Sequence, residues 1–446
     1  MLPAKFTHRM KSRLGEQYSE FEDALAKPAP VSVRLNPKKS GPWVTGEDVP
    51  WSSMGRYLPA RPVFTLDPAL HAGAYYVQEA SSMFLEFAIR QHASTGPLVA
   101  LDLCAAPGGK STHLLGLLHK ESLLVSNEVI RTRASVLAEN ICKWGYPNAI
   151  VTQNDPHDFA ALTGFFDLVV VDAPCSGEGL FRKDAHAASE WSEEHVELCS
   201  LRQRRILADV WPSLKEDGLL IYCTCTYSEA ENEQTLLWLK HEQQLEFLAL
   251  KPPPEWGVEE VYSQGAVGYR FYPHRARGEG FFLAVMRKKS HAEPVRIRGR
   301  QSTALASANI RSRLDSWMQQ PEKLVVHQRD DLLIALPAGW LTSIDLILAQ
   351  LNVITRGTAL ASIKHDKLVA EHAWALSTEL RRGTFDECEV DEATALAFLR
   401  KENIHLPSDK KGMALVTHRQ LPLGWVNRLG NRTNNLYPAN WRIRMK

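Results

Sequence analysis

Apolar and polar positions alternate in blocks along the middle of the chain. Between about residues 97 and 286, short and nearly continuous apolar runs are separated by longer stretches with a helical pattern. The runs are PLVALDLCA, SLLVSNE, NAIVTQND, FDLVVVDAP, GLLIYCT and GFFLAVMRK. Such runs with helices between them are typical of a parallel sheet that is covered on both faces. The pattern therefore predicts a doubly wound α/β domain.

The segments on either side predict further modules. FTHRMKSRLGEQYSEFEDAL near the amino terminus has a helical pattern, and YYVQEASSMFLEFAIRQH is expected to form a helix that enters the α/β domain. After Lys289, the basic and polar segment KKSHAEPVRIRGRQSTALASANIRSR suits a linker. Beyond it, DDLLIALPAGW, the periodicity around Leu346 and GMALVTHRQLPLGWVNRLG indicate smaller modules, some of them β-rich. We predict domains over residues 1–92, 93–290, 291–380 and 381–446.

Composition excludes several classes of protein. The 446 residues are 44% hydrophobic and 23% charged, with a formal net charge of +1, which is typical of a globular chain. Seven irregularly spaced cysteines do not suit a secreted disulfide framework, and no apolar run approaches the roughly 20 residues of a bilayer span. The amino terminus carries charges where a signal peptide needs its apolar segment. We therefore expect a cytoplasmic protein without membrane contact, and a monomer by default.

Four of the apolar runs end in side chains that could hold a ligand. In doubly wound sheets, ligands bind beyond the carboxyl ends of the strands. Those positions are Cys104, Glu128, Asp155 and Asp172, and we expect all four to line one crevice. The alternative for each acid, above all for Asp155, is a helix N-cap or an exposed strand end.

A glycine-containing turn follows the first run. In LDLCAAPGGKS, Gly108 and Gly109 permit a close backbone approach to a ligand where a helix begins. The spacing is neither that of dinucleotide binders nor that of a phosphate-wrapping loop. Glu128, about 20 residues further on, can accept hydrogen bonds from ribose hydroxyls. A nucleoside-bearing cofactor without a pyrophosphate fits this arrangement, and S-adenosylmethionine is the candidate.

Two cysteine-containing segments reach the same edge of the predicted sheet. DAPCSGEG and YCTCT each end an apolar run. Cysteine is usually a small buried residue, which suits Cys142, Cys199 and to a lesser degree Cys223. It suits Cys175 and Cys225 poorly, because both follow strand ends at the expected cofactor pocket. Without a C-x₂-C pair or a matching histidine spacing, we predict no metal.

Two thiols beside a methyl donor fit covalent catalysis on cytosine. Carbon 5 of cytosine is a poor nucleophile, but a thiolate added to carbon 6 makes the ring enamine-like. After methylation, a base must remove the proton from carbon 5 before the enzyme thiol can leave.

Several motifs, in their order along the chain, resemble the RNA 5-methylcytosine methyltransferases of the Nol1/Nop2/Sun family. They are PVSVRLNP, YYVQEASSM, LDLCAAPGGKS, NDP, VVVDAPCSGEG, YCTCTYSEAENE and FYPHRARGEGFFLAVMRK. The resemblance covers roughly residues 30–290, and GWVNRLGNRTNNLYPANWRI near the end resembles, more weakly, a PUA-like module. It implies a Rossmann-like methyltransferase domain, an α+β N-terminal module and small C-terminal modules, the last PUA-like.

The resemblance also implies roles for individual residues. Cys225 would attack carbon 6 and Cys175 would assist product release and take part in proton removal. Lys110 and Asp172 would contact the target base. The cofactor would be held by Cys104, Ala105, Ala106, Pro107, Gly108, Gly109, Lys110, Glu128, Asp155 and Asp172. Ser176 after the first cysteine favours the RNA enzymes over the DNA cytosine methyltransferases, and Cys223 stands where serine is more frequent in the family.

The charges around the thiols allow one further expectation. Asp172 would raise the pKa of nearby cysteines, whereas Lys110 and the sulfonium of the cofactor would lower it. We therefore predict that Cys225 becomes most nucleophilic once the cofactor is bound.

The tail of the chain favours RNA as the partner. From Lys410 to Lys446 there are eight Lys or Arg and no Asp or Glu. Positive charge neutralises phosphates, and aromatic side chains stack on bases. The interleaved aromatic residues are Trp425, Tyr437 and Trp441. Candidates to hold the RNA backbone are Arg270, His274, Arg275 and Arg277. The alternative is a basic surface on a small module whose aromatic residues belong to its core.

The leading hypothesis is S-adenosylmethionine-dependent methylation of cytosine at carbon 5 in RNA, above all in 16S ribosomal RNA or the small ribosomal subunit. The alternatives are a tRNA cytosine-5 methyltransferase and a non-catalytic RNA-binding factor of ribosome assembly. A nucleotide-dependent oxidoreductase is not favoured by the Gly-Gly-Lys turn.

Overall fold

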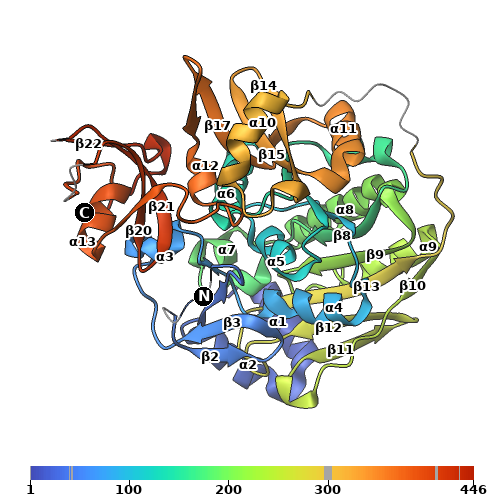
Figure 1. The fold of residues 1–446 in the computed structure, drawn as a ribbon. Helices are drawn as coiled ribbons and strands as arrows, with labels where there is room; N and C mark the ends of the chain where they lie inside the picture. Colours follow the sequence, from blue (N-terminus) through green and yellow to red (C-terminus); the bar gives the residue numbers. More distant parts are fainter. Residues whose placement is uncertain are drawn as a thin grey trace.

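The computed structural model describes residues 2–39, 41, 44–295, 304–406, 410–430 and 432–445. At its centre is one large sheet (Figure 1). Its strands are β5 (Val99–Asp102), β6 (Leu123–Asn127), β7 (Ala149–Thr152), β8 (Phe166–Asp172), β9 (Leu214–Thr224), β10 (Leu245–Phe247), β11 (Glu259–Ser263), β12 (Ala266–Phe271), β13 (Phe281–Lys288) and β16 (Val353–Arg356). They follow the order β11-β12-β13-β9-β8-β5-β6-β7-β16, with β10 beside β13.

The six apolar runs all form strands of this sheet, as predicted. From β7 to β9 the neighbouring strands are parallel. The last run, β13, is instead antiparallel to β9. It is also antiparallel to β12, which precedes it, so no crossover helix connects the two.

Helices cover both faces of the sheet, which confirms the doubly wound architecture. Val99 and Leu101 of β5 belong to one apolar cluster and Ala100 to the other, as expected for alternating side chains. The first cluster also contains apolar residues of α8 (Glu193–Val210) and α9 (Glu233–Glu242). The second contains those of α4 (Leu85–His92), α5 (Gly109–Leu117) and α6 (Arg131–Trp144).

The N-terminal module combines helices with a small sheet. Its elements are α1 (Ala4–Leu14), α2 (Tyr18–Ala26), α3 (Pro68–His71), β1 (Val31–Leu35), β2 (Glu47–Val49), β3 (Ser52–Leu58) and β4 (Tyr75–Val77). The segment that begins at Tyr75 is not helical throughout, because β4 pairs with β1 and α4 begins only at Leu85. Two tyrosines and a valine favour a strand at this place.

The middle module contributes a strand to the central sheet. Its own sheet has the order β14-β15-β17-β18, with β14 (Leu324–Arg329), β15 (Leu332–Pro337), β17 (Thr358–Lys364) and β18 (Lys367–Ala370). Its helices are α10 (Ala308–Leu314), α11 (Leu341–Gln350) and α12 (His372–Ala375). Between them, β16 pairs antiparallel with β7 and covers that edge of the central sheet. The predicted linker is too long, because α10 already begins at Ala308; residues 296–303 of the linker lie outside the described residues.

The terminal module packs against the N-terminal module. It contains β19 (Asp386–Glu389), β20 (Gly412–His418), β21 (Leu421–Arg428), β22 (Thr433–Asn435) and α13 (Glu392–Leu399). The segment GMALVTHRQLPLGWVNRLG forms the predicted β-rich structure, the hairpin of β20 and β21. Val33 and Tyr75 share an apolar cluster with Phe398 and Val416, and α3 lies beside α13 (Figure 1).

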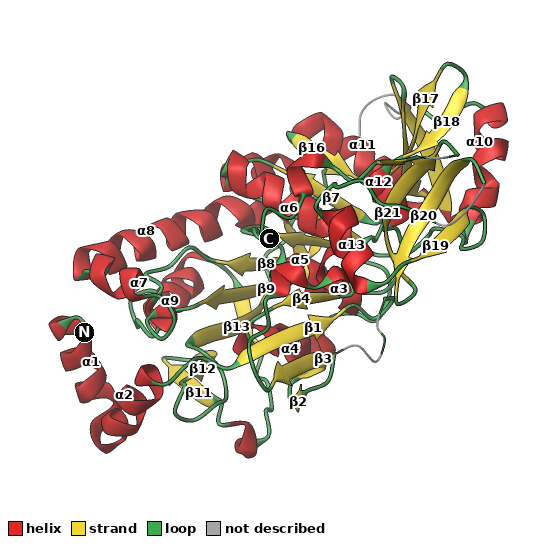
Figure 2. Cartoon of the chain, turned by 90° about the vertical axis from the view of Figure 1, so that its left-hand side faces the viewer, coloured by secondary structure: helices red, strands yellow, loops and turns green. Residues whose placement is uncertain are grey.

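The first two helices lie far from the sheet of the middle module. Helices α1 and α2 are at the opposite end of the molecule from β17 and β18 (Figure 2). Within the described ranges, none of the helices combines the length and the apolar character of a membrane span.

Candidate active site

A cavity of about 570 Å³ opens at the carboxyl ends of the parallel strands. Its wall includes Cys104, Glu128 and Asp155, three of the four residues predicted to share a crevice. Asp172 ends β8 next to this cavity, but its side chain pairs with Lys110 and does not line the cavity wall. The structure therefore brings three of the four residues to one cavity and places the fourth beside it.

The turn after β5 forms one border of the cavity. Gly108 has φ 115°, in the left-handed region that favours glycine, and α5 begins at the next residue. The backbone of the turn is fixed from β6 and α6. The bonds run from Ala105 N to Asn127 O (2.8 Å), from Arg133 Nη2 to Ala106 O (2.9 Å) and from Asn140 Nδ2 to Pro107 O (2.8 Å).

Glu128 directly follows β6 and carries a buried carboxylate. Its side chain is 3% exposed. Oε1 accepts a hydrogen bond from the backbone N–H of Ile130 at 2.9 Å, and Oε2 is 3.3 Å from Arg133 Nη1. The carboxylate is thus held in a fixed orientation at the cavity wall.

Asp155 has the N-cap role that was the alternative prediction, although it also lines the cavity. It caps the short helix Pro156–Leu162 by accepting the His157 N–H, and Asp158 completes a capping box. Arg205 Nη2 lies 2.7 Å from its Oδ2. Desolvation opposes ionisation, but the His157 hydrogen bond and the Arg205 guanidinium hold the pKa of the Asp155 carboxyl below its usual value.

Asp102 is a buried acid that the sequence analysis did not single out. It ends β5 and is 0% exposed. Its Oδ2 accepts a 2.6 Å hydrogen bond from Ser111 Oγ, and its Oδ1 has no hydrogen-bond partner among the described residues. Burial raises the pKa of this carboxyl to about 7. Its position inside the motif LDLCAAPGGKS was the signal that could have identified it.

Cys175 and Cys225 lie together, as predicted. They follow β8 and β9, and the parallel register places Asp172 opposite Cys223, so the two loops leave the sheet side by side. Their Sγ atoms are 3.1 Å apart, and the backbone N–H of Cys225 points to Cys175 Sγ at 3.4 Å. The hydrogen bond with Cys225 and burial raise the pKa of the Cys175 thiol well above its usual value. Cys223 is 0% exposed and belongs to the apolar core.

Lys110 and Asp172 form the second pair of the site. Lys110 Nζ is 2.8 Å from Asp172 Oδ2 and 5.2 Å from the centre of the Phe281 ring. Burial disfavours the ammonium form, but the Asp172 carboxylate outweighs it and raises the pKa of Lys110. Asp172 remains 39% exposed, so the pair is buried on one side and accessible on the other.

The predicted RNA contact of Arg270 is wrong. Arg270 is 0% exposed, and its Nη2 contacts both oxygens of Glu233 at 2.9 and 2.8 Å. Three neighbouring candidates remain partly accessible. His274 is 3.5 Å from Gln17, Arg275 pairs with Glu259 at 2.5 Å and Arg277 pairs with Glu47.

The aromatic residues of the tail are mainly core residues, which corrects the predicted stacking on bases. Trp425 and Tyr437 are each 1% exposed; Trp425 packs in an apolar cluster with residues of the middle module, and Tyr437 packs in one with residues of the N-terminal module. Trp441 is only partly buried. The acidic strand β19 also lies beside the basic tail, and Asp386 pairs with Arg428 at 2.6 Å.

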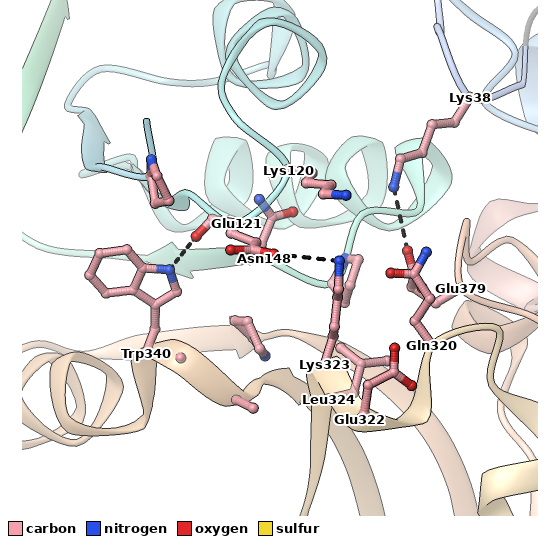
Figure 3. A pocket seen from close by; sticks show the side chains of 15 residues that line it. Lys38, Lys120, Glu121, Asn148, Gln320, Glu322, Lys323, Leu324, Trp340 and Glu379 are labelled. Atoms are coloured by element: carbon pink, nitrogen blue, oxygen red, sulfur yellow. Dashed lines mark hydrogen bonds and ion pairs between the residues drawn. The ribbon is translucent and has the colours of Figure 1, made fainter. Parts of the chain in front are cut away.

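A second cavity, of about 440 Å³, lies between the domain of the central sheet and the middle module. Figure 3 shows Lys38, Lys323 and Trp340 at its wall. Lys323 pairs with Glu121 at 3.4 Å, Lys38 pairs with Glu379 at 3.4 Å, and Trp340 Nε1 donates to the Glu121 carbonyl. The Glu121 contacts join the central-sheet domain to the middle module, and the Lys38 contact joins the N-terminal module to the middle module. The predicted site residues lie elsewhere.

Comparisons with known proteins agree with the motifs. Residues 93–287 match the family described as 16S rRNA methyltransferase RsmB/F. Residues 2–80 match the N-terminal domain of 16S rRNA methyltransferase RsmF, and residues 385–443 match the methyltransferase RsmF PUA domain. The predicted relationship and the predicted PUA-like module are thereby confirmed.

Individual relatives support the same assignment. Ribosomal RNA small subunit methyltransferase F of Shewanella loihica is 30% identical, over 94% of this chain and 91% of that protein. Among solved structures, a methyltransferase homologue from Pyrococcus horikoshii has a TM-score of 0.53 and 26% identity, covering 61% of this chain and 91% of that one. NSun6 from Pyrococcus horikoshii, solved with SFG, has a TM-score of 0.55 and 19% identity, covering 65% and 98%, which shows a shared fold.

Proposed function

The chain belongs to the family of ribosomal RNA small subunit methyltransferase F, whose cofactor is S-adenosylmethionine, and on that premise we propose that it methylates carbon 5 of a cytosine in 16S ribosomal RNA. The reaction would pass through a covalent bond between Cys225 and carbon 6 of the ring. The supporting observation is the pair of thiols, 3.1 Å apart, at the strand ends beside the Lys110–Asp172 pair.

The 570 Å³ cavity fits the cofactor. Buried or half-buried carboxylates at Glu128 and Asp155 suit ribose hydroxyls, and the apolar side chains of Val129 and Ile130 suit a purine ring. Asp102 ends β5 directly before the turn, and its Oδ1, which has no partner among the described residues, is the candidate for a further acceptor. S-adenosylmethionine, when bound, supplies an electrophilic methyl group on a sulfonium.

Cys225 acts as the nucleophile in this proposal. Its thiolate would form a bond to carbon 6, and the electron pair of the 5,6 double bond would move to carbon 5. Carbon 5 would then take the methyl group as the bond between that methyl and the sulfonium sulfur breaks, which would leave a neutral thioether. A base then removes the proton from carbon 5, the double bond forms again, and the bond between sulfur and carbon 6 breaks. Cys225 leaves as a thiolate, ready for the next cycle.

Lys110 and Asp172 are proposed to hold the target base. An ammonium donates hydrogen bonds and a carboxylate accepts them, so together they can recognise the acceptor and amino groups on the pairing edge of cytosine. Asp172 is accessible enough to reach a ligand, while the contact with Lys110 fixes its orientation. The target base must first leave its stack, at a cost of about a few kcal/mol.

Cys175 is proposed to assist product release. Because its pKa is raised, its sulfur stays protonated at neutral pH, and the S–H can donate a hydrogen bond to the neighbouring Cys225 sulfur. Such a donor stabilises the thiolate that leaves carbon 6.

The RNA-binding PUA domain suits ribosomal RNA, naked or in the small subunit, as the partner. We also propose that the protein works in the cytoplasm as a monomer. The seven cysteines, all free thiols, support a reducing compartment.

Transfer of tritium from the labelled cofactor to 16S ribosomal RNA tests the activity, and bisulfite mapping tests the position on cytosine. Cys225→Ala should abolish transfer and leave no covalent RNA adduct. Cys175→Ala should accumulate protein bound to RNA, visible as a retarded band on a denaturing gel. The reverse pattern would refute the assignment of the two cysteines.

A further inference from the structure

A buried carboxylate, Glu231, lies behind the two active-site cysteines. Its side chain accepts four hydrogen bonds, which fill the acceptor positions of both oxygens. Oε1 receives the backbone N–H of Ser176 at 2.8 Å and Gln203 Nε2 at 3.0 Å. Oε2 receives Ser176 Oγ at 2.5 Å and Thr226 Oγ1 at 3.2 Å. Glu231 itself is 0% exposed.

The donors are the immediate neighbours of the two cysteines. Ser176 follows Cys175, and Thr226 follows Cys225. Ser176 Oγ and Thr226 Oγ1 are also 3.0 Å apart. We propose that Glu231 is a positioning residue that sets the separation of the two thiols by holding both cysteine loops from behind; this rests on the proposed function of the thiols.

Glu231 is well placed for this task because its own backbone is fixed. The hydroxyl of Tyr222, in β9, donates to the Glu231 carbonyl at 2.7 Å. Gln203, in α8, also donates to the Pro174 carbonyl at 3.0 Å, and Pro174 lines the cofactor cavity. One network therefore connects both cysteine loops with the wall of that cavity.

A purely stabilising role would not require a carboxylate at this place. Burying a charged group is costly, and well-packed apolar side chains often replace buried ions without loss of stability. A carboxylate that accepts from four donors, in contrast, fixes the direction of each donor. Glu231 therefore determines the geometry of the two cysteine loops.

Two substitutions separate positioning from packing. Glu231→Met keeps a similar length but loses all four hydrogen bonds. Glu231→Gln can keep them, because the hydroxyls of Ser176 and Thr226 can accept from the new amide. Glu229→Gln is the matched control, since Glu229 lies two residues earlier and its side chain is 58% exposed.

The first readout is independent of RNA. Diamide oxidises two adjacent thiols to a disulfide and takes up their two hydrogens, so its rate on Cys175 and Cys225 reports how the sulfurs are placed. Peptide mapping identifies the bonded pair. We expect Glu231→Met to slow this reaction at least about tenfold, because misplacement of about 1 Å has large effects on rate. Glu231→Gln and Glu229→Gln should remain near the wild-type rate.

The second readout is steady-state methylation. In Glu231→Met, kcat should fall about 100-fold while KM for the cofactor stays within about threefold. A folded Glu231→Met protein with wild-type disulfide formation and wild-type kcat overturns the proposal. An equal loss of kcat and of disulfide rate in Glu231→Gln also overturns the proposal. That result would mean that the negative charge of Glu231, and not its hydrogen bonds, supports the reaction.

Thermal unfolding establishes which variants are folded. If Glu231→Met does not fold, Ser176→Ala takes its place, since it removes one hydroxyl donor and leaves three donors. It should slow disulfide formation partially, and an unchanged rate would overturn the proposal. Failure of the covalent mechanism would appear separately, as the absence of an RNA adduct in Cys175→Ala with Glu231 intact.

Discussion

Replacing Arg270 separates a structural role from an RNA-binding role. The guanidinium is 0% exposed, contacts both oxygens of Glu233 and lies 5.4 Å from the centre of the Phe282 ring. Arg270→Met removes the charge and leaves Glu233, whose side chain is 10% exposed, with Arg13 at 3.1 Å. We expect a loss of unfolding free energy, and no loss of RNA affinity.

The size of the expected loss in unfolding free energy follows from the burial of the Arg270–Glu233 pair. Removing one partner of a buried ion pair costs about 3–5 kcal/mol, and the remaining contact with Arg13 places this case near 3 kcal/mol. Arg275→Met is the control, because its side chain is 38% exposed and its pair with Glu259 should contribute at most about 1 kcal/mol.

Urea unfolding measures the stability of each variant, and filter binding to 16S ribosomal RNA at fixed salt measures its affinity. Arg270→Met should unfold at lower urea and bind RNA like the wild type at a temperature where it is folded. Unchanged stability together with weaker RNA binding would refute the assignment and restore Arg270 as an RNA contact.

Three further predictions concern the cofactor side of the site. The pKa of Asp102 is about 7 in the folded protein against a usual 3.8, so the folded state binds this proton more tightly and wild-type stability rises as the pH falls from about 7 toward 3.8. The side chain in Asp102→Asn does not titrate. In urea unfolding without cofactor, the stability of this variant relative to the wild type should therefore be highest above pH 7 and decrease below pH 7. A stability difference that does not vary with pH would contradict this prediction. Glu128→Gln should weaken cofactor binding at least about tenfold in calorimetry, because it replaces a two-oxygen acceptor on the cavity wall by an amide with one acceptor oxygen; unchanged affinity would exclude Glu128 from the cofactor site. Alkylation of Cys225, followed across pH by mass spectrometry, should shift to lower pH when a cofactor analogue is bound, because its positive charge favours the thiolate; an unchanged titration would count against this.

Local sequence patterns could predict the centre of the fold and the meeting of the two thiols. Each of the six strands is a continuous apolar run, and the carboxyl ends of parallel strands meet at one edge of a sheet. Cys175 and Cys225 directly follow such ends, so their proximity required no knowledge of packing between distant segments.

Features that depend on contacts between distant segments could not be predicted in this way. The strand β16 pairs with β7 about 200 positions away in the sequence, and its short run NVITRG carries no signal for its partner. Arg270 stands in a basic stretch and looked exposed, but its burial depends on Glu233 in another element. Glu231 belongs to a conspicuous acidic cluster, yet only the folded loops bring its four donors together.

The domain boundaries at 93 and 290 remain a prediction. The pairing of β16 with β7 affects where the chain could be shortened to obtain the catalytic domain alone. A shortened chain that stops at 290 would keep the pairing of β7 with β6, but it would leave the β7 backbone groups that face β16 without partners and would uncover the apolar side chains that contact α11. We expect such a fragment to aggregate through that free edge. The smallest catalytic piece that could be produced on its own should therefore extend at least through Arg356.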